Sequence, residues 1–295
     1  MTDLRYAACE RITLDASIII GTRNRADVLE KTLLSLSLMR ATSDIKYEII
    51  VVDNGSTDST NSVVSAWFDR LPIRYLYEAQ PGLSRARNRG FTASCGRYIF
   101  FTDDDCIASP NWLITGIHLL SEIPRQVIGG RIELHDPTDR PLTLKLEDSP
   151  ASLSSVGDLF GFLHGCNMIL GRCVVDEVGP FDTLLGPGTR CKAAEDADFV
   201  YRAFRQGIPI HYRPELHLAH NHGRKHASDE QILLNGYVLS VGAIAMKHIL
   251  HGDISLLKVA YWNLRSEHRI QKLRRIKNYL RGAAKYGQSL LERAG

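Results

Sequence analysis

Three consecutive carboxylates, Asp103, Asp104 and Asp105, follow directly after an apolar run at 98–102 (YIFFT). Aromatic and β-branched residues favour a strand, so the acids should lie at its carboxyl end. Adjacent carboxylates repel one another, which indicates a cation beside them. Carboxylate oxygens suit Mg²⁺ or Mn²⁺, which proteins hold through one or two acids and substrate phosphates. The alternative is an acidic turn in which an aspartate caps the next helix.

A second acidic pair, Glu195 and Asp196, lies at the start of a predicted helix over 194–206. The helix dipole would hold these carboxylates ionised, although acids in a first turn are also ordinary caps. Histidines cluster further on, at positions 217, 220, 222 and 226. Imidazole is a common zinc ligand, but this spacing matches no zinc motif, and no cysteine lies nearby in the sequence. A zinc site and solvent-exposed histidines both remain open.

Strand-like and helix-like segments alternate through the N-terminal third of the chain. Apolar runs predict strands at 16–20, 47–52, 73–77 and 98–102. Amphipathic stretches predict helices that begin near Asp27, after the loop 53–58 and at Leu83. Continuous apolar strands joined by helices indicate parallel pairing with right-handed crossovers, hence an α/β fold with a mostly parallel central sheet. Ligands bind at one edge of such sheets, so we expect four loops to converge there: 22–25, 53–58, 81–88 and 103–105.

The remaining segments are less regular. The patterns predict a helix over 112–120, a strand over 127–134, a polar loop over 136–155 and a short helix over 174–179. From about residue 229 the pattern is helical to the end. We therefore expect a main domain over 1–227 and a basic, helical C-terminal extension over 228–295.

Charge is unevenly distributed along the 295 residues, whose formal net charge is +3. The segment 258–293 carries ten Lys and Arg against two Glu, so the preceding chain is net acidic. Two interpretations remain open: a packed helical extension with a solvated basic face, or docking on an anionic membrane surface. Charge alone would also suit nucleic acid, but no nucleic-acid motif accompanies it, so no nucleic acid is predicted as a partner.

Cysteine usage and the N-terminus predict a cytoplasmic protein. The six cysteines form no Cys-x-x-Cys pair, which indicates reduced thiols rather than disulfides or a zinc ribbon. The N-terminus (MTDLRY) lacks a basic region followed by an apolar segment, so no signal peptide is predicted. The longest apolar segment, 237–246, is about half a membrane span. Contact with the inner face of the membrane would then be peripheral, through the basic helices.

Several motifs together resemble the family 2 glycosyltransferases of the GT-A fold. They occur in order at 17–25 (SIIIGTRNR), 51–60 (VVDNGSTDST), 82–90 (GLSRARNRG) and 101–105 (FTDDD), and continue at 165–168 (GCNM), 179–182 (GPFD) and 195–199 (EDADF). The resemblance covers roughly residues 15–222. Two departures stand out: Gly21-Thr-Arg-Asn, where the family often has Pro-Thr-Tyr-Asn, and Asp53-Asn54, where many members have two aspartates.

The resemblance implies a metal-dependent, inverting transfer from a nucleoside-diphosphate sugar to a hydroxyl of a glycan or a lipid-linked acceptor. The implied cofactor is Mn²⁺ or Mg²⁺, which would stabilise the charge that grows on the leaving diphosphate. The implied metal ligands are Asp105, Asp103 and His220, the last chosen because it lies six residues after Pro214. Asp196 is the implied general base, with Glu195 as the less favoured candidate.

The resemblance also assigns binding residues. The donor would contact residues of the first four motifs: Thr22, Arg23, Asn24, Asp53, Asn54, Arg87, Asp103 and Asp104. Arg87 is expected to bind a phosphate with its planar fork, although an exposed basic helix face explains the neighbouring arginines equally well. The acceptor side would be lined by Gly165, Cys166 and Asn167, for which a buried strand is the alternative.

Two other functions remain open. A sugar nucleotidyltransferase also uses carboxylates and Mg²⁺ on an α/β sheet, but it should carry a glycine-rich N-terminal loop, and residues 21–25 (GTRNR) are poor in glycine. A nucleotide-sugar-binding or scaffold protein without turnover is the second alternative. The intact acids at 103–105 and 195–196 argue against it, and a turnover assay would decide.

Overall fold

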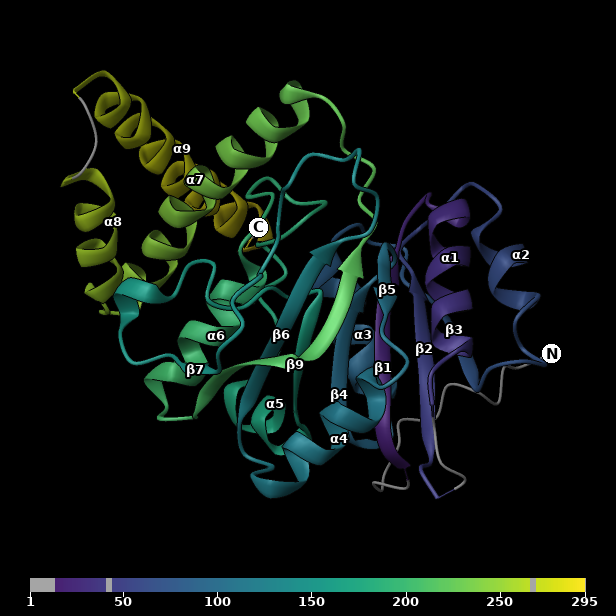
Figure 1. The fold of residues 1–295 in the computed structure, drawn as a ribbon. Helices are drawn as coiled ribbons and strands as arrows, with labels where there is room; N and C mark the ends of the chain where they lie inside the picture. The colour runs from purple at the N-terminus through teal and green to yellow at the C-terminus, as the bar shows by residue number, and fades with distance from the viewer. Residues whose placement is uncertain (1–13, 41–43, 266–268, 295) are drawn as a thin grey trace.

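The computed structural model describes residues 14–40, 44–265 and 269–294. Their central feature is a nine-stranded sheet with the order β3-β2-β1-β4-β8-β6-β9-β5, in which β7 also pairs with β9 (Figure 1). The strands are β1 (Leu14–Thr22), β2 (Tyr47–Asp53), β3 (Ile73–Tyr77), β4 (Gly96–Asp103), β5 (Cys106–Ala108), β6 (Val127–Leu134), β7 (Ala151–Ser152), β8 (Asn167–Gly171) and β9 (Ile210–His220).

The N-terminal half of the sheet is parallel, as predicted. Strands β3, β2, β1 and β4 pair in parallel, and they alternate with α1 (Ala26–Ser37), α2 (Thr60–Ser65) and α3 (Leu83–Ala93). Gly21 of β1 is in register with Asp103 of β4, and Thr22 with Asp53 of β2. The carboxyl ends of these strands therefore meet at one edge of the sheet, and the α/β fold expected from the sequence is confirmed.

The C-terminal half of the sheet contains antiparallel pairings that the sequence patterns did not predict. Strand β8 runs antiparallel to both β4 and β6, and β5 runs antiparallel to β9. Strand β9 is parallel to β6, with a shift of register between Gly130 and Arg131. The pairing of β5 with β9 sets Cys106 opposite His220. A histidine far along the chain is thus brought to the strand that directly follows the three acids.

Hydrophobic side chains fill both faces of the sheet. Along β1, Ile19 packs into the cluster on one face while Ile18 and Ile20 pack into the cluster on the other, as expected for alternating side chains. Helix α3 lies close against the sheet, because a Cβ at Gly90 would come 2.5 Å from Ile19 Cγ2. The remaining elements before the C-terminal helices are α4 (Trp112–Glu122), the short 3₁₀ helix η1 (Val156–Asp158), α5 (Arg172–Val178) and α6 (Glu195–Arg205).

Helices follow β9 in the described residues, as predicted: α7 (Ala227–Leu250), α8 (Ser255–Arg265) and α9 (Arg269–Ala294). Helices α7 and α9 cross beside α6 (Figure 1). Their backbones touch, since a Cβ at Gly242 would come 2.0 Å from the Tyr279 carbonyl oxygen. Within the described part of the chain, α7 alone is long and apolar enough to cross a membrane, but 39% of its apolar window is buried in the protein. Core helices of soluble proteins pass the same test.

The cysteines only partly follow the sequence-based prediction. Cys106, Cys166, Cys173 and Cys191 are free thiols, as expected. Cys95, at the loop before β4, is disulfide-bonded, so the prediction of reduced thiols is wrong at this position. Isolated cysteines carry no spacing signal, because two residues far apart in the sequence can meet in the fold. Cys9 lies outside the described residues.

Candidate functional site

A cavity of about 370 Å³ opens at the carboxyl edge of the parallel strands. Its walls come from the ends of β1 and β4, the N-termini of α3 and α6, the residues before β8, the end of β9 and one face of α7. The loops at 22–25, 81–88 and 103–105 all contribute to it, whereas only Asn54 of the loop 53–58 does. Most of the predicted convergence is therefore confirmed.

Asp104 supports the site from behind. Its buried carboxylate accepts a hydrogen bond from Thr22 Oγ1 at 2.7 Å and lies 3.3 Å from Arg25 Nε. Thr32 Oγ1 donates to its main-chain carbonyl at 2.7 Å. Burial raises the pKa of Asp104 to about 7, against the opposing charge of Arg25. This side chain joins β4 to β1 and α1.

Asp105 forms the centre of a buried polar group. Its carboxylate lies 2.8 Å from Arg25 Nη2 and 3.2 Å from His220 Nε2, and Thr143 Oγ1 lies 2.8 Å from the other ring nitrogen of His220. Burial alone would raise the pKa of Asp105, but the contacts with His220 and Arg25 hold it well below its ordinary value. The carboxylate is therefore ionised at neutral pH.

The donor atoms around Asp105 fit a divalent cation. One ligand atom each from Asp105, Cys106 and His220 lie within 4.8 Å of one another. No cysteine lies near the histidines in the sequence, but the pairing of β5 with β9 brings Cys106 to His220. The hydrogen bond with Cys166 and burial raise the pKa of the Cys106 thiol. The three ligand atoms together form a candidate site for a divalent cation.

Arg87 is a buried cation between two carboxylates. Its Nη2 lies 3.0 Å from Asp103 Oδ1, and its Nη1 lies 2.9 Å from Glu195 Oε1. Burial would lower the pKa of Arg87, but Asp103 and Glu195 outweigh it and raise the pKa. Gly165 leaves the space for this side chain, since a Cβ there would come 2.8 Å from Arg87 Nη1. Arg87 lines the cavity, and its predicted contact with a phosphate stays a prediction.

Glu195 and Asp196 have different surroundings although they are adjacent. Glu195 is buried, and burial together with the charge of Asp196 raises its pKa to about 7. Asp196 is only partly buried and lines the cavity. Its Oδ2 accepts the Gly165 N–H at 2.8 Å, and its Oδ1 accepts the Ala197 N–H at 2.8 Å. Both acids line the cavity, and Asp196 is the more exposed of the two.

Several residues assigned to the donor or acceptor by resemblance hold loops in place. Asp53 accepts hydrogen bonds from Ser56 N at 2.7 Å and Tyr75 Oη at 2.6 Å. Asn24 Oδ1 accepts the Thr57 N–H at 2.7 Å. The cavity is not lined by Asp53, Asn24 or Asn167. Asn167 Oδ1 instead accepts the Trp112 Nε1–H at 2.9 Å, and its Nδ2 donates to two main-chain carbonyls.

The two departures from the family pattern have structural reasons. Asn54 Oδ1 accepts the Gly82 N–H at 2.7 Å, while its Nδ2 donates to the carbonyls of Glu78 and Gln80. An aspartate could accept the first bond but could not donate the others. Gly21 allows α3 to approach, because a Cβ there would come 2.9 Å from Leu83 Cδ1.

The other predicted residues line the cavity, together with some that the sequence reasoning missed. Thr22, Arg23, Gly165, Cys166 and His220 all face it. The missed ones include Arg25, which lies inside the motif 17–25 and could have been selected as a cation beside three acids. Further residues that the sequence reasoning missed also line the cavity: Thr143, His164, Lys192, Arg224 and Tyr237. No pattern indicated that the predicted loop over 136–155 or the predicted C-terminal helices would reach this edge of the sheet.

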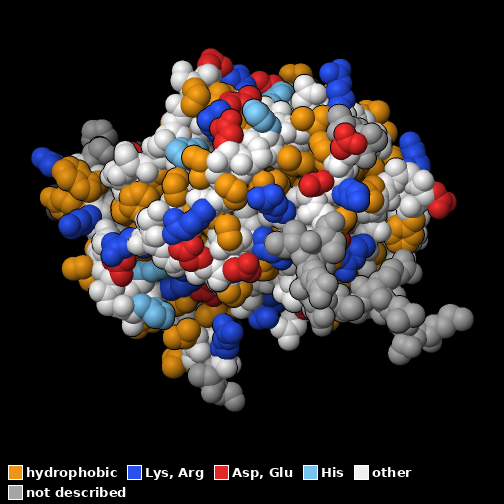
Figure 2. All heavy atoms as spheres, turned by 90° about the horizontal axis from the view of Figure 1, so that it is seen from below, with side chains coloured by type: hydrophobic (Ala, Val, Ile, Leu, Met, Phe, Trp, Pro, Cys, Tyr) orange, Lys and Arg blue, Asp and Glu red, His pale blue; other side chains and the backbone are white. Residues whose placement is uncertain are grey.

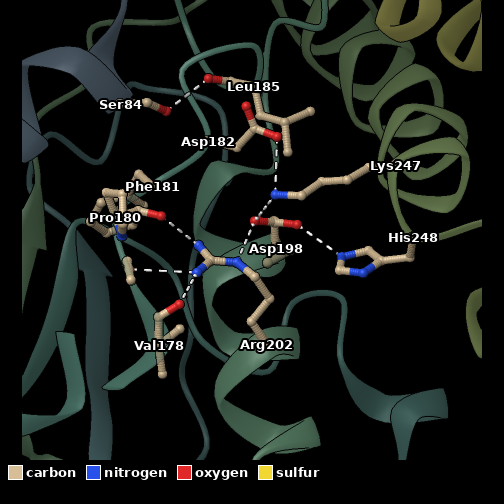
Figure 3. Close-up of polar contacts among 12 residues, drawn as sticks. Ser84, Val178, Pro180, Phe181, Asp182, Leu185, Asp198, Arg202, Lys247 and His248 are labelled. Atoms are coloured by element: carbon tan, nitrogen blue, oxygen red, sulfur yellow. Dashed lines mark hydrogen bonds and ion pairs between the residues drawn. The ribbon is translucent and has the colours of Figure 1, made fainter. Parts of the chain in front are cut away.

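A second polar cluster connects α6 to α7 behind the cavity (Figure 3). The buried Asp198 carboxylate lies 2.8 Å from Lys247 Nζ, 2.9 Å from His248 Nε2 and 2.9 Å from Arg202 Nε. Lys247 Nζ also lies 3.0 Å from Asp182 Oδ2. Burial alone would raise the pKa of Asp198, but these partners hold it well below its ordinary value. The C-terminal helices thus anchor the helix that carries Asp196.

Comparisons with known proteins give one consistent family. The model of glycosyl transferase family 2 matches residues 17–179. The glycosyltransferase AglE of Haloferax volcanii is 29% identical over 183 residues, which are 58% of this chain and 57% of AglE. The chain covers 57%, 32% and 29% of the first three curated relatives, so it spans well under two thirds of their lengths.

Two solved structures share the fold at low sequence identity. A mannosyltransferase from Pyrobaculum calidifontis, PcManGT, in complex with GDP-Man and Mn²⁺, is 16% identical, with a TM-score of 0.66 over 92% of this chain and 76% of that one. Residues 1–349 of S. aureus TarS, in complex with UDP-GlcNAc, are also 16% identical, with a TM-score of 0.60 over 92% of this chain and 82% of that one.

Proposed function

Because the chain belongs to glycosyl transferase family 2, we propose that it is a metal-dependent, inverting glycosyltransferase. The donor would be a nucleoside-diphosphate sugar, and the acceptor a hydroxyl of a glycan or of a lipid-linked molecule. One observation carries the proposal: a single cavity brings the carboxylate–imidazole pair of Asp105 and His220 and the partly buried acid Asp196 to the same edge of the sheet. A metal-dependent inverting transfer requires both a metal site and a general base.

The metal would be held by Asp105 and His220, with Asp103 beside them. Bound Mn²⁺ or Mg²⁺ would supply positive charge for the diphosphate of the donor. Thr143 orients the His220 ring through its contact with Nδ1, so that Nε2 faces Asp105. The complex of the Pyrobaculum calidifontis relative with GDP-Man and Mn²⁺ supports this assignment by analogy of fold alone.

Asp196 would take the proton from the acceptor hydroxyl. The Gly165 N–H holds its Oδ2, which fixes the direction of the carboxylate into the cavity. Arg87 pairs with Glu195 and Asp103, so the neighbouring acids are compensated and Asp196 remains the one available base. Water exclusion would come from α7, whose Leu233 and Tyr237 form one wall of the cavity.

The test is direct binding and hydrolysis of a panel of nucleotide sugars, measured with Mn²⁺, with Mg²⁺ and with a chelator. We expect one donor to bind only with metal, and Asp105→Ala to abolish this binding. Asp158→Ala, an exposed aspartate of η1 outside the cavity, is the matched control and should bind as the wild type does. If no nucleotide sugar binds with either metal, the proposed function is wrong.

The proposed location is the cytoplasmic side of a membrane, with peripheral contact through α8. Leu257, Tyr261 and Trp262 expose their side chains on this helix, and the Arg265 guanidinium lies 5.4 Å from the Trp262 ring. Hydrophobic side chains gather beside Lys and Arg at the left edge of the face in Figure 2. Aromatic and basic side chains together are typical of helices that lie in the interface of an anionic membrane.

A further inference from the structure

A second hollow, a groove of about 730 Å³, lies between α7, α9 and the loop before α6. Five cationic side chains line this basic groove, and no carboxylate does: Lys192, Arg274, Lys277, Arg281 and Lys285. Such a concentration of one sign of charge on a concave surface produces a strong positive potential. The groove is therefore suited to an anion with more than one charge.

The cations of the basic groove are not neutralised by the protein. Within the described ranges none of the five forms an ion pair with an acid, and Lys285 Nζ contacts only the Arg190 carbonyl, at 3.5 Å. The nearest acid of α9, Glu292, is already paired with Arg190 at 3.0 Å. Charges in structural clusters are usually matched by neighbours, as Asp198 is here. Lys192, Arg274, Lys277 and Arg281 are exposed, so an external anion can reach them.

The walls of the basic groove are rigid. A Cβ at Gly282 of α9 would come 1.9 Å from the Leu239 carbonyl oxygen of α7, so the two helices are in direct backbone contact. Tyr286 Oη donates to Asp182 Oδ2 at 2.9 Å, which ties α9 to the loop before α6. The cations thus project from elements that are already packed, and binding an anion requires no ordering of the helices.

The basic groove adjoins the catalytic cavity, because Lys192 lines both of them. Helix α7 separates the two spaces: Ile232 and Gly236 face the groove, whereas the adjacent Leu233 and Tyr237 face the cavity. A molecule that reached from Asp196 into the groove would therefore meet Lys192 on the way. This position belongs to the acceptor side, because the donor-side loops lie at the strand ends.

We propose that the basic groove binds phosphate groups of the acceptor while another part of the same acceptor reaches Asp196. The proposal rests on the proposed transferase function. Phosphate esters suit the groove because the guanidinium groups of Arg274 and Arg281 can each bind two phosphate oxygens, and lysines add further charge. A membrane headgroup is the other source of phosphate. We favour the acceptor because the groove is concave and adjoins the cavity, whereas the exposed aromatic residues lie on α8.

Calorimetric titration with inorganic pyrophosphate in the presence of a chelator tests the groove without turnover. We expect the double variant Lys277→Gln/Arg281→Gln to bind pyrophosphate at least about tenfold more weakly than the wild type, since each charged contact contributes to affinity. Lys272→Gln is the matched control, because this lysine lies on α9 but does not line the groove. Thermal unfolding of the three proteins checks that the helices remain folded.

Equal pyrophosphate affinity in the wild type and the double variant would overturn the proposal. If the double variant then binds phosphatidylglycerol vesicles as the wild type does, the pyrophosphate binds at another site. If the double variant instead loses vesicle binding, the cations belong to a membrane-docking surface. Donor binding by the wild type is measured separately with Mn²⁺. If the protein binds a nucleotide sugar but no pyrophosphate, only the proposed role of the basic groove is wrong. If it binds pyrophosphate but no nucleotide sugar, the proposed transferase function is wrong.

Discussion

Adjacent acids at the start of α6 acquire different properties from their surroundings. Glu195 is buried against Arg87, and its raised pKa reflects the cost of placing charge in the interior. Asp196 keeps access to the cavity while two main-chain N–H groups hold its oxygens. In the sequence, only the family pattern favours Asp196 over Glu195 as the general base. In the fold, the difference in burial between the two carboxylates favours it as well.

Replacing Asp196 by Asn tests the base. The amide keeps the shape but cannot accept a proton, so sugar transfer should fall by about 10²–10⁴. Donor binding should persist, because the residues around Asp105 are unchanged. The measurements are the kcat of sugar transfer and the calorimetric affinity for the donor, each for the variant and the wild type. Glu195→Gln serves as the paired variant, and the assignment fails if this change abolishes transfer while Asp196→Asn leaves it intact.

The candidate site could be predicted in part from residue types. Asp105, His220, Asp196 and Arg87 all meet in one cavity, as expected from the motifs. The motifs also contain residues such as Asp53 and Asn24, whose oxygens accept main-chain N–H groups instead. A short polar pattern cannot distinguish an oxygen that binds a ligand from one that closes a turn, since both uses require the same acceptor.

At the scale of elements, β9 and β5 decide where the histidine lies. The register shift in β9 falls between Arg213 and His217, around Pro214, which has no N–H for the ladder. This irregularity and the many polar residues of β9 hide its strand periodicity. Strand β5 has only three residues, too few for any pattern. Strands β1 to β4 and β6 were predictable from their apolar runs, whereas the short β5 and the polar β9 were not.

The anchoring of α6 by α7 gives a stability prediction. Asp198→Asn leaves Lys247 and Arg202 without their buried partner, which should lower the free energy of unfolding by about 3–5 kcal/mol at pH 7. Glu177→Gln, which alters an exposed pair with Arg125, should cost less than about 1 kcal/mol. Chemical denaturation of both variants gives these values.

The same variant has a predictable pH dependence. The native state lowers the pKa of Asp198, so this carboxylate stabilises the fold above the ordinary aspartate pKa and loses that contribution as the pH falls below it. The difference between wild type and Asp198→Asn should therefore shrink progressively from about pH 4 downward. A difference that stays constant over this range would contradict the assigned ion pairs.

For the whole molecule, the exposed aromatic residues of α8 give a prediction about location. Tyr261 and Trp262 are 61% and 58% exposed. The double variant Tyr261→Ser/Trp262→Ser should bind phosphatidylglycerol vesicles about tenfold or more weakly, because each ring buries apolar area at an interface. Leu38→Ser, which removes an apolar side chain that is 66% exposed after α1, is the control. Co-sedimentation with vesicles measures the effect, and equal binding by all three proteins would exclude docking through α8.

Asp198 has a further consequence for how the chain is made. A ribosome completes the sheet and α6 before it adds Lys247, His248 and Tyr286. Until those residues emerge, Asp198 and Asp182 are carboxylates without these cationic and hydroxyl partners. In the newly synthesised N-terminal part, Arg202 of the same helix is then the partner of Asp198, and the contacts with α7 are still missing. A polypeptide shortened before α7 would lack the contacts that Lys247, His248 and Tyr286 make with Asp198 and Asp182.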